Sequence, residues 1–191
     1  MTRTDLNPSD SNTELPTRDQ RISDLLDKQD CAELVHRFAR AIDRCDEDLI
    51  GEVFHADATD DHGSYKGTAR EFVPWVIEVL EDMHRTQHII GNILIELEGD
   101  TAQGESYFIA HHTLPGENGE DNFMIAAGRY LDRFERRNGT WRIAHRGAVY
   151  DWSSIGPSTD IWDRASMADY SFGVRGKADP SYSHFGGLSG S

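Results

Sequence analysis

A histidine and an aspartate, about 45 residues apart, are the side chains of this chain best suited to proton transfer. His88 lies in an apolar, β-branched stretch at 85–92, and Asp43 lies near the end of an amphipathic helical pattern. A buried imidazole and a buried carboxylate both lose hydration, so each needs a hydrogen-bonding partner. If the two meet, they form a general base and the acid that orients it. His88 and Asp43 are therefore candidate catalytic residues.

Both residues also have an ordinary interpretation, as a satisfied strand histidine and as the polar end of a helix. Metal binding is a further alternative, because the chain has nine histidines. His111 and His112 are adjacent on a predicted strand, so they point to opposite faces and cannot ligate one ion together. The acidic segment that ends at His62 is typical of a solvated turn. We expect no metal site, and the absence of glycine-rich nucleotide motifs predicts no cofactor.

The elements that must position these residues follow from periodicity. Apolar residues at steps of three and four predict a helix over roughly 18–44, then a short helix that begins after Asp46 and a third that begins after Thr68, with Pro74 in or near its first turn. After Met83 the period becomes two and predicts strands at 86–98, 102–114, 122–136 and 140–151. Asn138-Gly139 is a strong hairpin signal. Helices followed by long antiparallel strands indicate an α+β fold, with helices covering a curved sheet.

Composition divides the chain into three parts. Residues 1–19 are polar and rich in Thr, Asp and Ser, which predicts a disordered arm. Residues 20–152 carry the periodic patterns and predict one domain. Residues 153–191 are rich in Ser and Gly but hold several large apolar side chains, so we expect this extension to be packed in part and disordered beyond.

A net charge of −15 argues against nucleic acid and anionic membranes as partners. No apolar run reaches the ~20 residues of a membrane span, and no signal peptide is evident. Two cysteines, Cys31 and Cys45, do not make a disulfide scaffold, so we expect a cytoplasmic protein.

Three segments resemble the SnoaL-like branch of the nuclear transport factor 2-like superfamily. They are ELVHRFARAIDRCDEDLIGEVFHAD at 33–57, RTQHIIGN at 85–92 and GRYLDRFERRNGTWRIAHR at 128–146. The resemblance covers about 20–152 and implies a cone-shaped α+β barrel, in which helices close a curved sheet around an apolar pocket.

The same resemblance implies roles for individual residues. Asp43 and His88 match the His–Asp dyad of scytalone dehydratase and hexachlorocyclohexane dehydrochlorinase. Arg146 falls where the dehydrochlorinase and bile acid 7α-dehydratase have a pocket arginine, and we expect it to be catalytic. Ile42 departs from the pattern, because scytalone dehydratase has a tyrosine there. Five further residues are expected to bind substrate: His112, His62, Tyr130, Phe38 and Trp75.

These features together predict a cofactor-independent lyase for a small apolar or aromatic hydroxylated substrate. The reaction would be a dehydratase-type β-elimination or the release of an aldehyde by carbon–carbon cleavage. An isomerase or polyketide cyclase of the same fold is one alternative, and a non-catalytic small subunit of a ring-hydroxylating dioxygenase is another. The resemblance also implies a homo-oligomer, trimer or dimer.

Overall fold

A long helix opens the part of the chain that the computed structural model describes, residues 15–185. Helix α1 (Arg18–Arg44) begins with a capping box, in which the Thr17 side chain accepts from the Gln20 amide and the Gln20 side chain accepts in return. It ends at Cys45 in the left-handed conformation, with φ of 50°. Its buried face includes Val35 and Phe38. The predicted helix is confirmed, and its last turn holds Asp43.

Two shorter helices follow. Helix α2 (Glu47–Val53) is capped by Asp46, and helix α3 (Ala69–Glu81) is capped by Thr68, both as predicted. Pro74 corrects the prediction, because it is the sixth residue of α3 and lies inside the helix rather than in its first turn. The proline has no amide hydrogen, so α3 lacks one internal hydrogen bond there.

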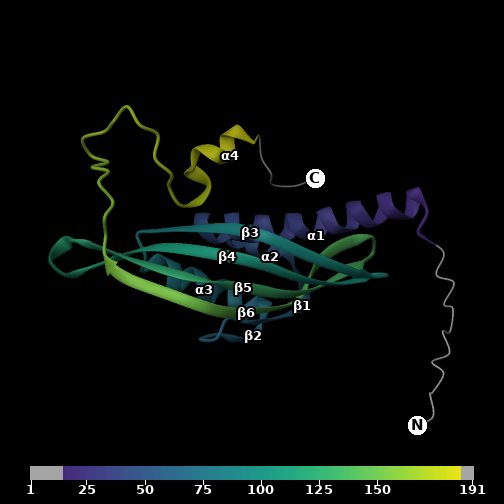
Figure 1. Cartoon of the computed structure of the whole chain (residues 1–191). Helices are drawn as coiled ribbons and strands as arrows, with labels where there is room; N and C mark the ends of the chain where they lie inside the picture. Colours follow the sequence, from purple (N-terminus) through teal and green to yellow (C-terminus); the bar gives the residue numbers. More distant parts are fainter. Residues whose placement is uncertain (1–14, 186–191) are drawn as a thin grey trace, which may run out of the picture.

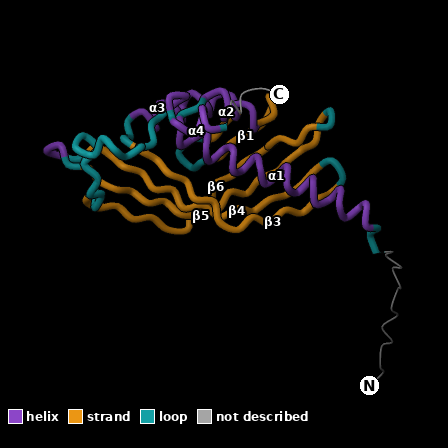
Figure 2. The backbone as a smooth tube through the Cα atoms, turned by 90° about the horizontal axis from the view of Figure 1, so that it is seen from above, coloured by secondary structure: helices purple, strands orange, loops and turns teal. Residues whose placement is uncertain are grey.

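The helices cover one face of a six-stranded curved sheet (Figures 1 and 2). Its order is β2-β1-β6-β5-β4-β3. The α+β class is confirmed, but the sheet is open rather than closed into a barrel. It is also not wholly antiparallel, because β1 pairs with β6 in parallel. The strands are β1 (Phe54–Asp61), β2 (Lys66–Thr68), β3 (Arg85–Glu98), β4 (Thr101–Pro115), β5 (Asp121–Arg137) and β6 (Thr140–Pro157).

Turns and bulges set which side chains face the helices. Asn138 and Gly139 both have positive φ, 53° and 80°, as the predicted two-residue hairpin requires. In β3 the register shifts between Ile90 and Ile93. His88 and Ile90 face inward, and the shift turns Ile93 inward too, where a strict period of two would place it outward.

The chain after β6 folds back over α1 (Figure 1). Strand β6 runs to Pro157, past the predicted domain edge at 152, and helix α4 (Pro180–His184) lies above α1. The contacts include Asp179 to Arg44 at 3.3 Å and a hydrogen bond from Tyr182 to Asp46 at 2.5 Å. Part of the extension is therefore packed. The disorder predicted for the two ends concerns mostly 1–14 and 186–191, outside the described residues.

None of the helices within 15–185 combines the length and the apolar character that crossing a membrane requires.

Candidate active site

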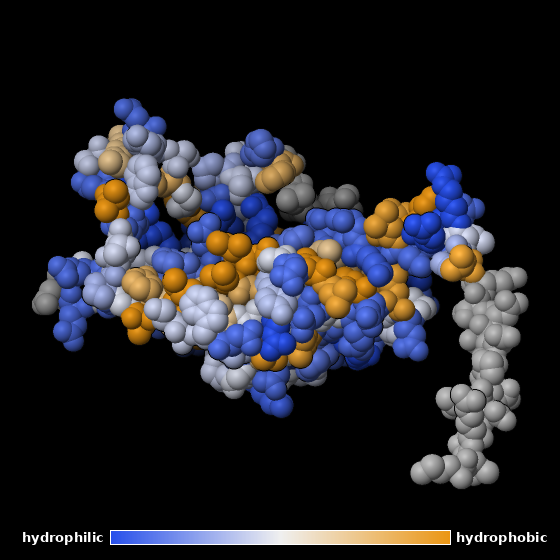
Figure 3. Space-filling model, in the orientation of Figure 1, coloured by the Kyte–Doolittle hydropathy of each residue, from blue (hydrophilic) through white to orange (hydrophobic). Residues whose placement is uncertain are grey.

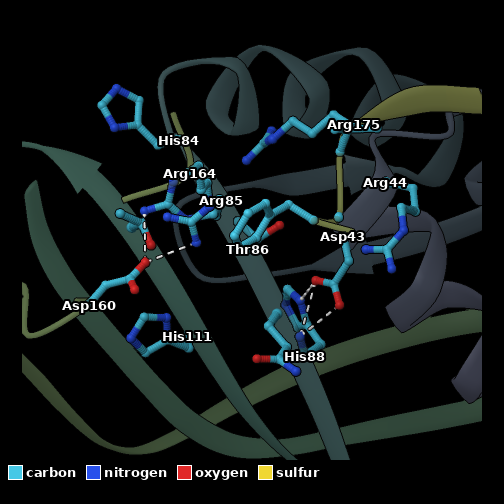
Figure 4. A pocket seen from close by; sticks show the side chains of 15 residues that line it. Asp43, Arg44, His84, Arg85, Thr86, His88, His111, Asp160, Arg164 and Arg175 are labelled. Carbon is cyan, nitrogen blue, oxygen red and sulfur yellow. Dashed lines mark hydrogen bonds and ion pairs between the residues drawn. The ribbon is translucent and has the colours of Figure 1, made fainter. Parts of the chain in front are cut away.

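His88 and Asp43 meet where the end of α1 lies against β3. His88 Nδ1 is 2.7 Å from Asp43 Oδ1, and the backbone amide of His88 donates to both carboxylate oxygens, at 3.1 and 2.9 Å. Both side chains are about nine-tenths buried. Figure 4 shows the carboxylate pointing at the imidazole ring. Because the carboxylate only accepts, Nδ1 carries the proton and the lone pair lies on Nε2.

A cavity of about 310 Å³ lies between the helices and the sheet, with His88 in its wall. The walls are mostly aromatic and aliphatic side chains from α1, α3, β4 and β5. Three histidines interrupt this apolar lining. Of the residues expected to bind substrate, the structure brings all five to this cavity: His112, His62, Tyr130, Phe38 and Trp75.

His112 faces His88 across 5.9 Å between ring centroids, in an edge-to-face arrangement. Burial, reinforced by the neighbouring His88, lowers the pKa of His112 to about 4. The ring is thus neutral at pH 7. Its Nδ1 donates to the Met124 carbonyl at 3.3 Å, which leaves Nε2 as an acceptor.

Arg146 does not line this cavity, contrary to expectation. Its side chain is fully buried and its Nε and Nη2 donate to Asp132, both at 2.7 Å. The guanidinium lies 4.2 Å from the ring centroids of Phe38 and Tyr130. The arginine therefore packs against these two rings through cation–π contacts, and the Asp132 carboxylate neutralises its charge.

A second histidine–carboxylate pair lies on the other side of the cavity. His62 Nδ1 contacts the Asp60 carboxylate at the end of β1, and the His62 ring stacks on Phe72 with centroids 4.8 Å apart. Asp60 is fully buried, whereas its partner retains a small exposed fraction. The segment expected to hold a solvated acidic turn thus points one of its acids, Asp60, inward.

A second cavity, of about 520 Å³, adjoins the first at His88 and is mostly polar (Figure 4). Residues 172–175 of the C-terminal extension form part of its wall. Arg85 and Arg164 both contact Asp160 there, at 3.4 and 3.0 Å. Among residues 15–185, no group of three or more His, Cys, Asp or Glu is gathered as metal ligands would be.

The sequence reasoning missed three residues of this region. Asp132 was not singled out, although the same resemblance that selects Arg146 also covers it. Asp60 was noted only within a possible metal-binding or solvated segment. Tyr150 lines the cavity and donates to the His62 carbonyl at 3.4 Å, and its place at the end of a predicted strand gave no signal.

A curved sheet covered by helices, with an aspartate-bound histidine in the wall of the apolar cavity between them, defines a cone-type α+β protein with a candidate acid–base site. A family model described as a SnoaL-like domain matches residues 23–147. The chain belongs to this family.

Proteins with similar sequences and structures are also known. An uncharacterized protein of Mycobacterium tuberculosis (strain H37Rv) is 26% identical, with 65% of this chain and 86% of the relative covered. The hexachlorocyclohexane dehydrochlorinase LinA-type3 of Novosphingobium barchaimii has a similar structure, with a TM-score of 0.63, 18% identity, and 74% and 96% of the two chains covered. A Novosphingobium aromaticivorans protein proposed to be a scytalone dehydratase has a TM-score of 0.62 and 18% identity, with 70% of this chain and 90% of that protein covered. These similarities show a common fold.

Proposed function

We propose that this protein is a cofactor-independent lyase in which His88 removes a proton from the substrate, from carbon in an elimination and from the hydroxyl group in a carbon–carbon cleavage. The observation that carries the proposal is the 2.7 Å contact between Asp43 and Nδ1 of His88, whose ring lies in the wall of an apolar cavity. Asp43 fixes the tautomer that leaves Nε2 free to accept, and stabilises the imidazolium that forms. This base requires neither a metal nor a nucleotide.

The cavity supports a small, largely apolar substrate. Its volume of about 310 Å³ is at the lower end of the ordinary range for small-molecule sites. Phe72, Trp75 and Phe108 provide flat apolar surfaces that suit an aromatic ring. Two structural relatives are named as a dehydrochlorinase and as a proposed dehydratase. Both names describe eliminations, which favours an elimination here too.

His112 gives the cavity a polar group that is neutral at pH 7. With Nδ1 engaged by the Met124 carbonyl, its Nε2 accepts a hydrogen bond from a substrate hydroxyl. It would therefore orient a hydroxylated substrate rather than donate a proton to it. Arg146 supports the aromatic wall, so we assign it no direct contact with substrate.

One probe distinguishes the candidate reactions. The aldol adduct of benzaldehyde and acetone is small, aromatic and hydroxylated, and has an acidic carbon–hydrogen bond beside its ketone. Loss of water gives benzalacetone, carbon–carbon cleavage gives benzaldehyde and acetone, and an isomerase leaves the mass unchanged. Mass spectrometry of the products identifies which reaction occurs.

We expect elimination or cleavage with the wild-type protein and none with His88→Gln. His145→Gln is the matched control, because His145 is exposed on β6 and lies outside the apolar cavity. Equal turnover by wild type and a folded His88→Gln variant would refute His88 as the base. An unchanged mass with a rearranged product would favour the isomerase, and copurification with a large iron–sulfur subunit would favour the structural role.

A further inference from the structure

Two His–Asp pairs each place their histidine in the wall of the apolar cavity. His88 with Asp43 lies at β3, and His62 with Asp60 lies at the end of β1, next to the other edge. We propose that His62 is a general acid that protonates the departing hydroxyl group while His88 removes the proton from carbon. The assignment rests on the proposed lyase function and adds a second catalytic residue to it.

The charges behind His62 support this role. Asp60, Arg146 and Asp132 lie side by side on β1, β6 and β5, because Asp60 pairs with Arg146 and Arg146 pairs with Asp132. All three side chains are buried. They carry two negative charges and one positive charge, and an uncompensated buried charge is costly. A proton on His62 makes the row electrically neutral.

The hydrogen bonds point the same way. Asp132 occupies Nε and Nη2 of Arg146, whereas Nη1 of the arginine and Oδ2 of Asp60 are buried and have no hydrogen-bond partner within residues 15–185. The arginine thus forms its ion pair with Asp132, and the partner of Asp60 is His62. Asp60 and Arg146 are positioning residues in this scheme, because neither lines the cavity.

The other groups that face His62 do not compete for its proton. Tyr150 donates to the His62 backbone carbonyl, and the Tyr130 ring lies 5.8 Å away. Burial raises the pKa of both phenols, so both are neutral at pH 7. Phe72 and Phe38 provide the remaining ring contacts.

The step is balanced without a further reactant. His88 Nε2 takes the proton from carbon, and the carbon–hydrogen electron pair becomes the new carbon–carbon double bond. The carbon–oxygen bond breaks with its electron pair on oxygen, and the oxygen takes a proton from His62 Nε2 and leaves as water. His88 ends as imidazolium and His62 as neutral imidazole, and exchange with solvent restores both.

Leaving-group dependence tests the assignment, because a departing hydroxide needs a proton and a departing chloride does not. The probes are the benzaldehyde–acetone adduct and the matching β-chloro ketone, with wild type, His62→Gln, His88→Gln and His145→Gln. We expect His62→Gln to slow the hydroxyl substrate by about 10²–10⁴-fold, the usual contribution of a general acid, and the chloro substrate only a few-fold. His88→Gln should slow both. Equal losses on both probes in His62→Gln, or no loss on either, would overturn the proposal.

A measurement without substrate separates this inference from the proposed function. Nitrogen-15 spectra of the histidine rings at neutral pH should show both nitrogens of His62 protonated in the wild type, and one of them deprotonated in Asp60→Asn. A neutral His62 in the wild type overturns the acid role whatever the activities are. A charged His62 in a protein that turns over neither probe would count against the lyase proposal and support the charged pair.

Discussion

Replacement of Asp43 by asparagine is the sharpest test of the His88 base. In the native protein both carboxylate oxygens accept from the His88 backbone amide, and one also accepts from Nδ1. The asparagine oxygen keeps the backbone contact, and its amide group then faces Nδ1. That nitrogen must become an acceptor, so the ring proton moves to Nε2 and the lone pair that faces the cavity is lost.

The expected loss is about 10⁴-fold in kcat, about 5 kcal/mol in the activation barrier, by comparison with removal of the orienting acid from a serine protease triad. KM should change little, because Asp43 does not line the apolar cavity. The assay is the initial rate of product formation from the benzaldehyde–acetone adduct. Asp24→Asn is the control, since Asp24 is an exposed carboxylate on the same helix.

Folding must be checked beside the rates. A neutral hydrogen bond in place of a charge-assisted one costs about 1–2 kcal/mol, so thermal unfolding should shift by only a few degrees. Asp43→Asn that unfolds like the control and retains more than about a tenth of the wild-type kcat would refute the tautomer argument. The action of His88 as a base would then not depend on Asp43.

Three further outcomes are expected. Arg146→Met should lower the free energy of unfolding by about 3–5 kcal/mol, because it strands Asp132 as an unpaired buried charge, and Arg146→Met combined with Asp132→Leu should recover much of the loss in denaturant melts. The pKa of His112, about 4 in the fold and 6.5 unperturbed, makes the unfolded chain bind more protons between these values. Stability should therefore rise from pH 4 to 6.5 by up to about 3 kcal/mol, and His112→Phe should flatten that rise in melts against pH. Ile89 and Ile109 are paired across β3 and β4 and are exposed by 55% and 43% on the outer sheet face, where apolar side chains gather over the strands (Figure 3). We propose that a second copy of the chain covers them, so Ile109→Asp should lower the mass measured by light scattering, and an unchanged mass would place the interface elsewhere.

The helices could be predicted because their signals are local. Apolar steps of three and four locate α1, and Asp46 and Thr68 have the side chains that cap the other two helices. The parallel pairing of β1 with β6 could not be predicted, because it joins strands about 80 residues apart with no shared turn. Whether the sheet closes beyond β3 likewise depends on all its strands together. No single segment of the sequence could therefore show that the expected barrel is open.

The contact between Asp132 and Arg146 could not be predicted from the sequence, because it depends on the register of β5 and β6. Counting back from the Asn138-Gly139 turn pairs Asp132 with His145. The shift between Arg133 and Phe134 moves the pairing by one residue, and Asp132 meets Arg146 instead. A one-residue shift exchanges the two faces of a strand, and nothing in the sequence marks this bulge. From the sequence, Arg146 is therefore expected to be a cation in the pocket, and its partner Asp132 is not predicted.

In the proposed mechanism, the base and the acid lie on different elements of the fold. His88 belongs to β3, one edge of the sheet, and is held by α1, whereas His62 follows β1 near the other edge. The curvature of the sheet brings both histidines to the same cavity. A change at 60–62 would alter how a leaving group is protonated and leave the base and its orienting carboxylate in place. In the proposed mechanism, proton removal and protonation of the leaving group are thus assigned to separate elements of this chain.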